Sequence, residues 1–320
     1  MAEPHPTQGA RRADLEERLQ AVRRELVRRE ESPAGSWIED SARDLAAGAK
    51  PGWYFPERPE DGIAFYARRG SAAYGHVHSS GANGPGAADA LARALLGGLP
   101  ADVRSINVGF SGLPAEAENA LAHRLGQRPG SRVIERQVME YALTSADEGA
   151  APETPRGLQA VGVRDVTLEA LTDLDWRSFR GTADELLVGT HVDEYRYVLE
   201  TILAGQLGRF VDEASIALIE PAPIRLVAAV LTAEQTIRRA ILVDLLVDPE
   251  RQRRGYGRFL LRWTLRSLRG LGYDSARLWV TKENTPALAL YAKFGFHAGA
   301  EAAIYRWERP GSDPQPHSPR

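Results

Sequence analysis

Two glycines, Gly255 and Gly257, stand in a basic turn whose residue types and spacing are typical of an anion site. An apolar, branched run at 240–247 predicts a buried strand before the turn, and an amphipathic helix follows directly. The first N–H groups of a helix lack internal partners, and the dipole is positive there. Glycine lets a phosphate approach the backbone, while Arg251, Arg253 and Arg254 add fixed charge. The pattern favours a bound polyphosphate; the alternative is an ordinary turn with solvated arginines.

The helix expected after this turn has one apolar side. Leu261, Leu265 and Leu268 recur at helical spacing, and Gly270 is a plausible end signal. Four arginines lie on the other side: Arg258, Arg262, Arg266 and Arg269. A strand, a glycine turn and a helix start therefore follow one another within a short stretch of sequence.

This stretch resembles the acetyl-CoA-binding motif of the GNAT N-acetyltransferase superfamily, which is Gln/Arg-x-x-Gly-x-Gly/Ala after the fourth strand. Here Gln252, Gly255 and Gly257 match it, after Leu-Leu-Val-Asp-Pro at 245–249. A second segment, Asn284 to Phe296, resembles the family's next motif and follows a predicted strand at 277–280. The resemblance implies a GNAT fold and an acetyl-CoA-dependent N-acetyltransferase that transfers the acetyl group directly to an amine.

The resemblance also implies where acetyl-CoA binds. In the family the fourth and fifth strands splay apart, and free backbone groups of the fourth strand hold the pantetheine arm and the thioester carbonyl. An amide aimed at that oxygen would be an oxyanion-type stabiliser. In this chain Asp248-Pro249 is expected to disturb the ladder at that strand end. The implied cofactor-binding residues are Leu245, Leu246, Val247, Gln252, Arg253, Arg254, Gly255, Tyr256, Gly257, Arg258, Asn284 and Tyr291.

Tyr291 and Asp244 are the expected catalytic residues. Tyr291 lies in Leu-Tyr-x-Lys-x-Gly-Phe, where the family has the general acid that protonates the departing thiolate. A phenol has a pKa of about 10 and can donate a proton at neutral pH. Packing against the cofactor is the alternative role. Asp244 is the first candidate for the general base; the alternative is a carboxylate paired with an arginine such as Arg239.

His191, Asp193 and Glu194 are second candidates for the base, in a segment that borders the acceptor in the family. Their other interpretation is a helix start, where negative charge is favourable. If Asp193, Glu194 and Asp244 converged, they would favour a cationic acceptor.

Composition excludes several classes of protein. A chain of 320 residues with 43% hydrophobic and 26% charged residues suits two soluble domains, and a net charge of −3 does not favour nucleic acid. There is no cysteine, and the histidines do not cluster at metal-ligand spacing, so no metal is expected. No apolar run suits a membrane span or a signal peptide, so we expect a cytoplasmic protein without membrane contact.

The first half of the chain repeats the element order of the second. Helices are predicted at 14–29, 36–45, 87–96, 115–125, 183–188, 192–203, 258–269 and 286–294, with another opening at Thr167; strands are predicted at 63–67, 72–77, 105–109, 132–141, 161–166, 215–219, 224–231, 236–247 and 277–280. The segment Gly84-Pro85-Gly86 falls where Gly255-Tyr256-Gly257 falls. We interpret this as a tandem duplication.

The first copy is expected to be degenerate. No glutamine or arginine precedes Gly84 at the motif spacing, Pro85 removes an amide, and Ala122 stands where Tyr291 stands. A packing half that shapes the active half is favoured over a second CoA site. The predicted fold class is α/β, with two GNAT-like domains that each have a mixed, mainly antiparallel sheet flanked by helices. The predicted segments are a disordered tail at 1–12, a degenerate GNAT-like domain at 13–143, a linker at 144–157, a catalytic GNAT domain at 158–309 and a disordered tail at 310–320.

Three functions remain open from the sequence. The first is acetylation of a small-molecule amine or a protein amine. The second is a mycothiol synthase-like acetylation of an amino-sugar–cysteine conjugate, although the charged helix at 14–29 fits that family poorly. The third is a non-catalytic acyl-CoA sensor or interaction module. DNA contact by the 14–29 helix is disfavoured because acidic residues interleave with its arginines, and the protein is expected to be a monomeric pseudo-dimer or a homodimer.

Overall fold

The computed structural model describes residues 3–28, 37–58, 62–69, 71–80, 83–143 and 151–310. The chain divides into two compact units: unit 1 is Met1–Glu135 with Glu301–Arg320, and unit 2 is Arg136–Ala300. Much of the predicted linker, 144–150, and almost all of the predicted tail, 311–320, lie outside the described residues. None of the helices in the described ranges combines the length and apolar character needed to cross a membrane.

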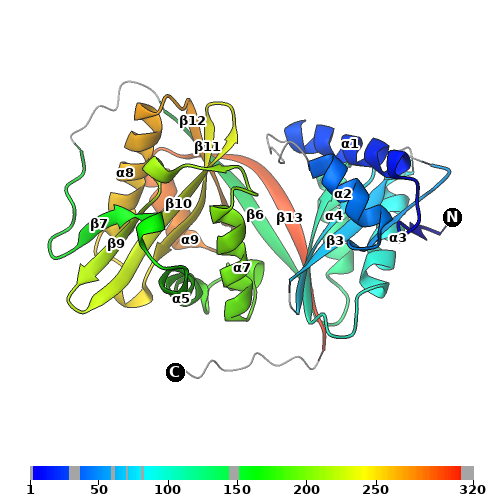
Figure 1. The fold of residues 1–320 in the computed structure, drawn as a ribbon, viewed down its shortest axis with the longest axis horizontal. Helices are drawn as coiled ribbons and strands as arrows, with labels where there is room; N and C mark the ends of the chain where they lie inside the picture. Colours follow the sequence, from blue (N-terminus) through cyan, green and yellow to red (C-terminus); the bar gives the residue numbers. More distant parts are fainter. Residues whose placement is uncertain are drawn as a thin grey trace. The chain divides into compact units, whose positions relative to one another are not determined.

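Unit 1 has a sheet with helices on both faces (Figure 1). Its elements are β1 (His5–Pro6), α1 (Arg12–Arg28), α2 (Trp37–Ala46), β2 (Gly52–Tyr54), β3 (Ile63–Arg69), β4 (Ala72–His78), α3 (Gly84–Gly97), β5 (Ser105–Ser111) and α4 (Ala115–Leu125), and β13 (His297–Glu308) completes the sheet in the order β1-β2-β3-β4-β5-β13. Leu15, Leu19 and Val22 of α1 are fully buried with α2 against one face. The helix at 14–29 is therefore a packing helix, because its apolar stripe has a partner.

The tail predicted at 1–12 includes ordered structure. His5–Pro6 pairs with Trp53 and Tyr54 of β2, and Thr7 is buried, with its amide bonded to Gly52 O at 2.9 Å. Two residues that add to a sheet edge carry no periodic signal, so the sequence pattern gave no indication of this strand.

Unit 2 has a sheet in the order β6-β12-β11-β10-β9-β7. Its elements are β6 (Ser131–Ala142), β7 (Gln159–Gly162), η2 (Val163–Asp165), α5 (Leu168–Phe179), α6 (Glu185–Val188), α7 (Val192–Leu203), β8 (Arg209–Phe210), η3 (Asp212–Ala214), β9 (Ile216–Pro221), β10 (Ile224–Thr236), β11 (Arg239–Val247), η4 (Pro249–Arg251), α8 (Tyr256–Gly270), β12 (Ser275–Thr281) and α9 (Thr285–Lys293). Thr167 caps α5 through Ala170 N, as predicted.

Two separate cores lie on the two faces of this sheet. Ala228 and Val230 of β10 enter the core with α8, whereas Ala229 and Leu231 enter the core with α5 and α7. Successive strand residues point to opposite faces, so a strand covered on both sides reads as a continuous apolar run. Figure 1 shows α8 and the α5–α7 pair on either side of β9, β10 and β11.

The last strand of each half belongs to the sheet of the other half. After α4, β6 pairs antiparallel with β12 along Arg136–Ala142. After α9, β13 pairs antiparallel with β5 along Tyr305–Glu308. The predicted boundaries at 143 and 158 therefore differ from the structural division at 135/136 and 300/301, because the sequence pattern identifies strands but not their partners.

The two halves share one topology. In unit 1, β3 and β4 are antiparallel while β4 and β5 are parallel, with α3 between them. In unit 2, β10 and β11 are antiparallel while β11 and β12 are parallel, with α8 between them. The correspondence of Gly84–Gly86 with Gly255–Gly257 thus coincides with the same corner of the two sheets.

Candidate functional site

The parallel strands β11 and β12 separate part way along their length. Their register pairs end at Leu242 and Leu278, although β11 continues to Val247 and β12 to Thr281. At the same place β11 has a bulge against β10, where Leu231 pairs with Asp244 and Thr232 with Leu242. A bulge bends its strand and re-aims the residues after it. The strands therefore diverge from Val243 onward, several residues before Asp248-Pro249, to which the sequence analysis attributed the disturbance.

Leu245, Leu246 and Val247 continue the register with β10 but not with β12. Leu246 is fully buried in the core with α5 and α7, so only its backbone is available to a ligand. Leu245 and Val247 alternate with it and are partly buried beside α8. This strand end thus offers backbone groups beside a small apolar surface.

The turn before α8 leaves the first amides of the helix open. Gly255 is the N-cap with φ 87°, and a Cβ built on it meets nothing within 4 Å. At Gly257 a Cβ would be in ordinary contact with Leu290, Leu245 and Val247, at 3.5–3.8 Å. Packing within the chain therefore does not require glycine at 257, which is consistent with close approach of a ligand to the backbone. Gln252, Arg253 and Arg254 are exposed on the same turn, and Arg253 has φ 61°.

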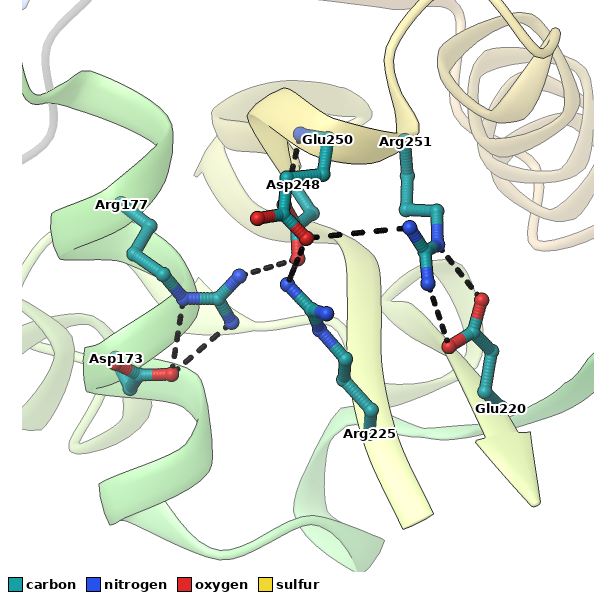
Figure 2. A network of polar contacts seen from close by, with 7 residues as sticks. All are labelled: Asp173, Arg177, Glu220, Arg225, Asp248, Glu250 and Arg251. Carbon is teal, nitrogen blue, oxygen red and sulfur yellow. Dashed lines mark hydrogen bonds and ion pairs between the residues drawn. The ribbon is translucent and has the colours of Figure 1, made fainter. Parts of the chain in front are cut away.

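A network of ion pairs braces this turn from behind (Figure 2). Asp248 is 1% exposed and accepts a hydrogen bond from Glu250 N at 3.0 Å. Its carboxylate also pairs with Arg177 of α5 and with Arg225 Nη2, the latter at 2.7 Å. The two guanidinium groups and the backbone amide hold the pKa of Asp248 below its ordinary value despite burial. The β11 end is thereby tied to α5 and β10.

Arg251 belongs to this brace and not to the exposed phosphate turn. Its guanidinium binds Glu220 of β9 in a bidentate manner, at 2.8 and 3.2 Å. From the sequence, Arg251 was expected to act with Arg253 and Arg254 as positive charge for a bound anion. That expectation was wrong for Arg251, because the η4 turn directs its side chain to a carboxylate on another strand.

Tyr291 lies on α9, whose start is fixed by Asn284. Asn284 is the N-cap, and its side chain accepts a hydrogen bond from Ala287 N at 3.2 Å. Its Nδ2 donates to Asp184 Oδ2 at 2.6 Å, and Thr281 Oγ1 donates to Asp184 Oδ1. Tyr291 is 8% exposed and packs on Phe296 with ring centroids 5.7 Å apart. Burial, together with the charges of Asp184 and Asp244, raises the pKa of Tyr291, so the phenol stays protonated.

Asp244 lies on β11 just after the bulge, in the same electrostatic environment as Tyr291. Its Oδ2 is buried without a hydrogen-bond partner among the described residues. Burial raises the pKa of Asp244 to about 7; Asp184 also raises it and Arg136 lowers it. The positive charge beside Asp244 thus comes from Arg136 of β6 and not from Arg239, whose Nε donates to Ser275 Oγ at 3.2 Å.

Arg136 joins the two carboxylates electrostatically. The register places it opposite Thr281, and its Nη1 lies 3.8 Å from Asp184 Oδ1. Burial lowers the pKa of Arg136, while Asp184, Asp244 and Tyr291 raise it. One guanidinium therefore faces the candidate base, the candidate acid and the carboxylate that fixes the α9 cap.

Three residues of this site were missed by the sequence analysis: Arg136, Asp175 and Asp184. The sequence did carry a signal for Arg136: in a strand it lies on the same face as Ile134 and Val138, which are buried. Asp175 likewise follows the buried Leu171 and Leu174 on α5. Asp184 falls within the helix predicted at 183–188 and is the N-cap of α6, but a four-residue helix gives no periodic pattern that marks a side chain.

The second base candidates form a helix start, as the alternative interpretation held. His191 is the N-cap of α7, and its amide donates to Glu194 Oε2 at 3.2 Å. Glu194 is 4% exposed and Asp193 is exposed at the first turn. The carboxylates electrostatically linked to Asp244 are Asp175 and Asp184.

Comparisons with known proteins identify relatives of parts of this chain. Residues 168–296 match the acetyltransferase (GNAT) family. The chain is 45% identical over 60 residues to a mycothiol acetyltransferase of Clavibacter sepedonicus, which covers 19% of this chain and 20% of that protein. It is 38% identical over 79 residues to a [ribosomal protein bS18]-alanine N-acetyltransferase of Salmonella typhimurium, or 25% of this chain and 51% of that protein. The chain thus spans about half, or less, of these curated relatives.

A likeness in fold extends over nearly the whole chain. A tandem GNAT protein from the clavulanic acid biosynthesis pathway superposes with a TM-score of 0.59 and 16% identity, covering 97% of this chain and 99% of that one. Residues 168–296 therefore form a domain of the acetyltransferase (GNAT) family, and the fold of nearly the whole chain is that of a tandem GNAT protein. The predicted α/β fold class of two GNAT-like domains is confirmed.

Proposed function

We propose that this protein transfers an acetyl group from acetyl-CoA directly to an amine. The observation that carries the proposal is the divergence of β11 from β12 beside the open, glycine-led start of α8. Strand backbone and helix amides come together there in unit 2, where residues 168–296 match the acetyltransferase (GNAT) family. The use of acetyl-CoA is a property of that family.

The residues present fit acetyl-CoA as a substrate. The amides from Arg253 to Arg258 would receive the diphosphate, because glycine at 255 and 257 leaves the backbone uncovered. Exposed Arg253 and Arg254 add positive charge beside those amides. The backbone of Leu245–Val247 would hold the pantetheine arm, since β12 no longer pairs with it.

Asp244 and Tyr291 supply the proton transfers in this proposal. Asp244, with a pKa of about 7, accepts a proton from the acceptor ammonium, so that the neutral nitrogen attacks the thioester carbon. The C–N bond forms, the C–S bond breaks, and Tyr291 donates its proton to the departing thiolate. Because burial raises its pKa, Tyr291 is protonated over the whole range in which Asp244 titrates.

The test measures thiol release from acetyl-CoA by the full-length chain with a panel of amines, alongside direct CoA binding. The full chain is required because a 158–309 fragment lacks β6, which pairs with β12 and carries Arg136. Amine-dependent thiol release supports the proposal. CoA binding without acetylation of any amine would support the non-catalytic sensor, and absence of CoA binding by the folded protein would refute both.

The mycothiol acetyltransferase similarity favours one particular acceptor as a second candidate. It is an amino-sugar–cysteine conjugate with a free amine. The bS18-alanine N-acetyltransferase similarity suggests a protein N-terminal amine as a third acceptor type. Adding the desacetyl thiol and a peptide with N-terminal alanine to the panel distinguishes these, since each predicts one acceptor with a much larger kcat/KM than the others.

A further inference from the structure

Asp175 is a buried carboxylate that the proposed mechanism does not use. It lies on α5, one residue after the fully buried Leu174, and is itself 1% exposed. Neither of its carboxylate oxygens has a hydrogen-bond partner among the described residues. Its electrostatic neighbour is Asp244, whose Oδ2 also lacks a partner within the described ranges.

Asp175 differs from Asp248, an equally buried carboxylate, in having no hydrogen-bond partner among the described residues. Both side chains are 1% exposed. Asp248 receives two arginines and a backbone amide, as expected for a buried charge. Asp175 receives none of these, although burying a carboxylate without a partner is strongly unfavourable.

Arg136 does not resolve this imbalance. Its guanidinium lies 3.8 Å from Asp184 and interacts with Asp244 and Tyr291. Asp175 is not among the groups that interact with this guanidinium, and its electrostatic neighbour is Asp244. Within the described ranges no three carboxylates or histidines group closely enough to hold a metal ion.

We propose that Asp175 binds a second cationic group of the acetyl acceptor, which is therefore a diamine or another amine with two positive charges. This inference rests on the proposed function, in which Asp244 faces the reacting nitrogen. The second ammonium supplies the hydrogen-bond donors that Asp175 lacks. A monoamine would leave Asp175 without a partner. The site would therefore prefer a diamine to a monoamine, because only the diamine satisfies this buried carboxylate.

The electrostatics agree with such a ligand. Burial and the charge of Asp244 raise the pKa of Asp175 well above its ordinary value. An ammonium bound beside it stabilises the ionised form. Binding of a diamine is therefore expected to release protons.

The experiment compares the α,ω-diamines from 1,3-diaminopropane to 1,6-diaminohexane with the monoamines of equal carbon number. The full-length protein is assayed with acetyl-CoA as wild type, Asp175→Asn and the control Asp173→Asn. Asp173 lies on the same helix but is 64% exposed and paired with Arg177. We expect the best diamine to exceed its monoamine about tenfold or more in kcat/KM. Asp175→Asn should remove that preference by lowering kcat/KM for the diamine, and Asp173→Asn should retain the preference.

Calorimetric binding of the same diamines, in buffers of different ionisation enthalpy, gives a readout that does not need turnover. Diamine binding that weakens about tenfold in Asp175→Asn and releases protons in wild type supports the site, even if no amine is acetylated and the proposed function fails. The inference is overturned if diamines and monoamines have equal kcat/KM, or if wild type and Asp175→Asn bind the diamine equally well. In either case, acetylation of monoamines would leave the proposed function standing. Thermal melting of each variant identifies a folding defect, and Asp175→Asn is expected to fold because the amide has nearly the shape of a protonated carboxyl group.

Discussion

The corner β4–α3–β5 and the corner β11–α8–β12 have the same topology but differ in whether the strands separate. β4 pairs with β5 along its whole length, from Ala72–Ser105 to His78–Ser111. β11 loses β12 after Leu242. The pairing of β3 with β4 has no register shift, whereas β10 and β11 have one at the point of separation. A bulge, and not the order of elements, therefore distinguishes an open corner from a closed one.

Side chains reinforce the closure of the first corner. Ser111 Oγ lies 2.7 Å from His76 Nε2 and 2.9 Å from His78 Nδ1. The ladder extends one residue further, where Ser79 N donates to Ser111 O at 3.1 Å. The place where the second corner opens is thus occupied by hydrogen bonds in the first.

The first turns of α3 and α8 differ in the same way, because the start of α3 is closed and the start of α8 is open. A Cβ on Gly84 would lie 2.6 Å from Leu113, and Pro85 removes an amide from the first turn of α3. Gly255, in contrast, has a positive φ and open space around it. A degenerate copy keeps its glycines for packing while losing the open amides that a phosphate would need.

The largest expected effect is on turnover in Tyr291→Phe. Ala122 stands at the corresponding position of the first copy and is fully buried, so only the second half has a phenol there. Loss of a general acid should lower kcat by about 10²–10⁴-fold. CoA affinity measured by calorimetry should stay within a factor of about two, because the ring remains. Unchanged kcat would assign Tyr291 to packing.

Gly255→Asp and Pro85→Asp place one negative charge at each helix start. In the second corner the aspartate meets the diphosphate and adopts φ 87°, so CoA affinity should fall about 30-fold or more. In the first corner Pro85 is exposed, and CoA affinity should change less than about twofold. A comparable loss from Pro85→Asp would mean that the closed corner also binds CoA.

Asp248→Asn tests whether the open corner depends on the brace behind it. Arg177 and Arg225 would both lose a buried carboxylate, and the free energy of unfolding should fall by about 3 kcal/mol. Glu250→Gln is the matched control, since Glu250 is 67% exposed and its pair should contribute less than about 1 kcal/mol. Urea unfolding measures both; similar losses would show that the brace is only a surface network.

Asp244→Asn should change the pH dependence of both activity and stability. A base with a pKa of about 7 makes kcat/KM rise with pH through that value, and the variant should lose most turnover. The folded-state pKa lies above the unfolded value of about 4, so the folded protein binds the extra proton between them. The free energy of unfolding therefore falls as pH rises from about 4 to 7, by up to about 1.4 kcal/mol per pH unit.

In Asp244→Asn that slope should flatten, although Asp175 contributes in the same direction because its pKa is also raised. Urea unfolding at several pH values measures it. An unchanged slope, with Asp173→Asn as the control, would show that Asp244 is ionised in the folded protein throughout this range.

The smallest effect is expected from Ser111→Ala in the first corner. Removing the hydroxyl leaves His76 and His78 without that contact and should reduce stability by about 1–2 kcal/mol. Acetyl transfer should not change, because the closed corner contributes no substrate contact in this mechanism. A marked loss of turnover in the folded variant would contradict that separation of roles.

The sequence by itself determined the elements and the motif. Helical spacing located α8 and α9, branched apolar runs located β10 and β11, and the glycine spacing located the open turn, because these patterns depend on neighbouring residues along one segment. The helix-start interpretation of His191 and Glu194 was also local, and the structure agrees with it.

Only the tertiary structure decided which distant residues meet. The exchange of β6 and β13 brings Arg136 to Asp184 and Asp244, and it depends on strand partners that period-two patterns do not specify. The pairing of Arg251 with Glu220 and the isolation of Asp175 likewise depend on side chains from other elements. Local periodicity fixes which face of an element is buried, but long-range packing decides what that face buries against.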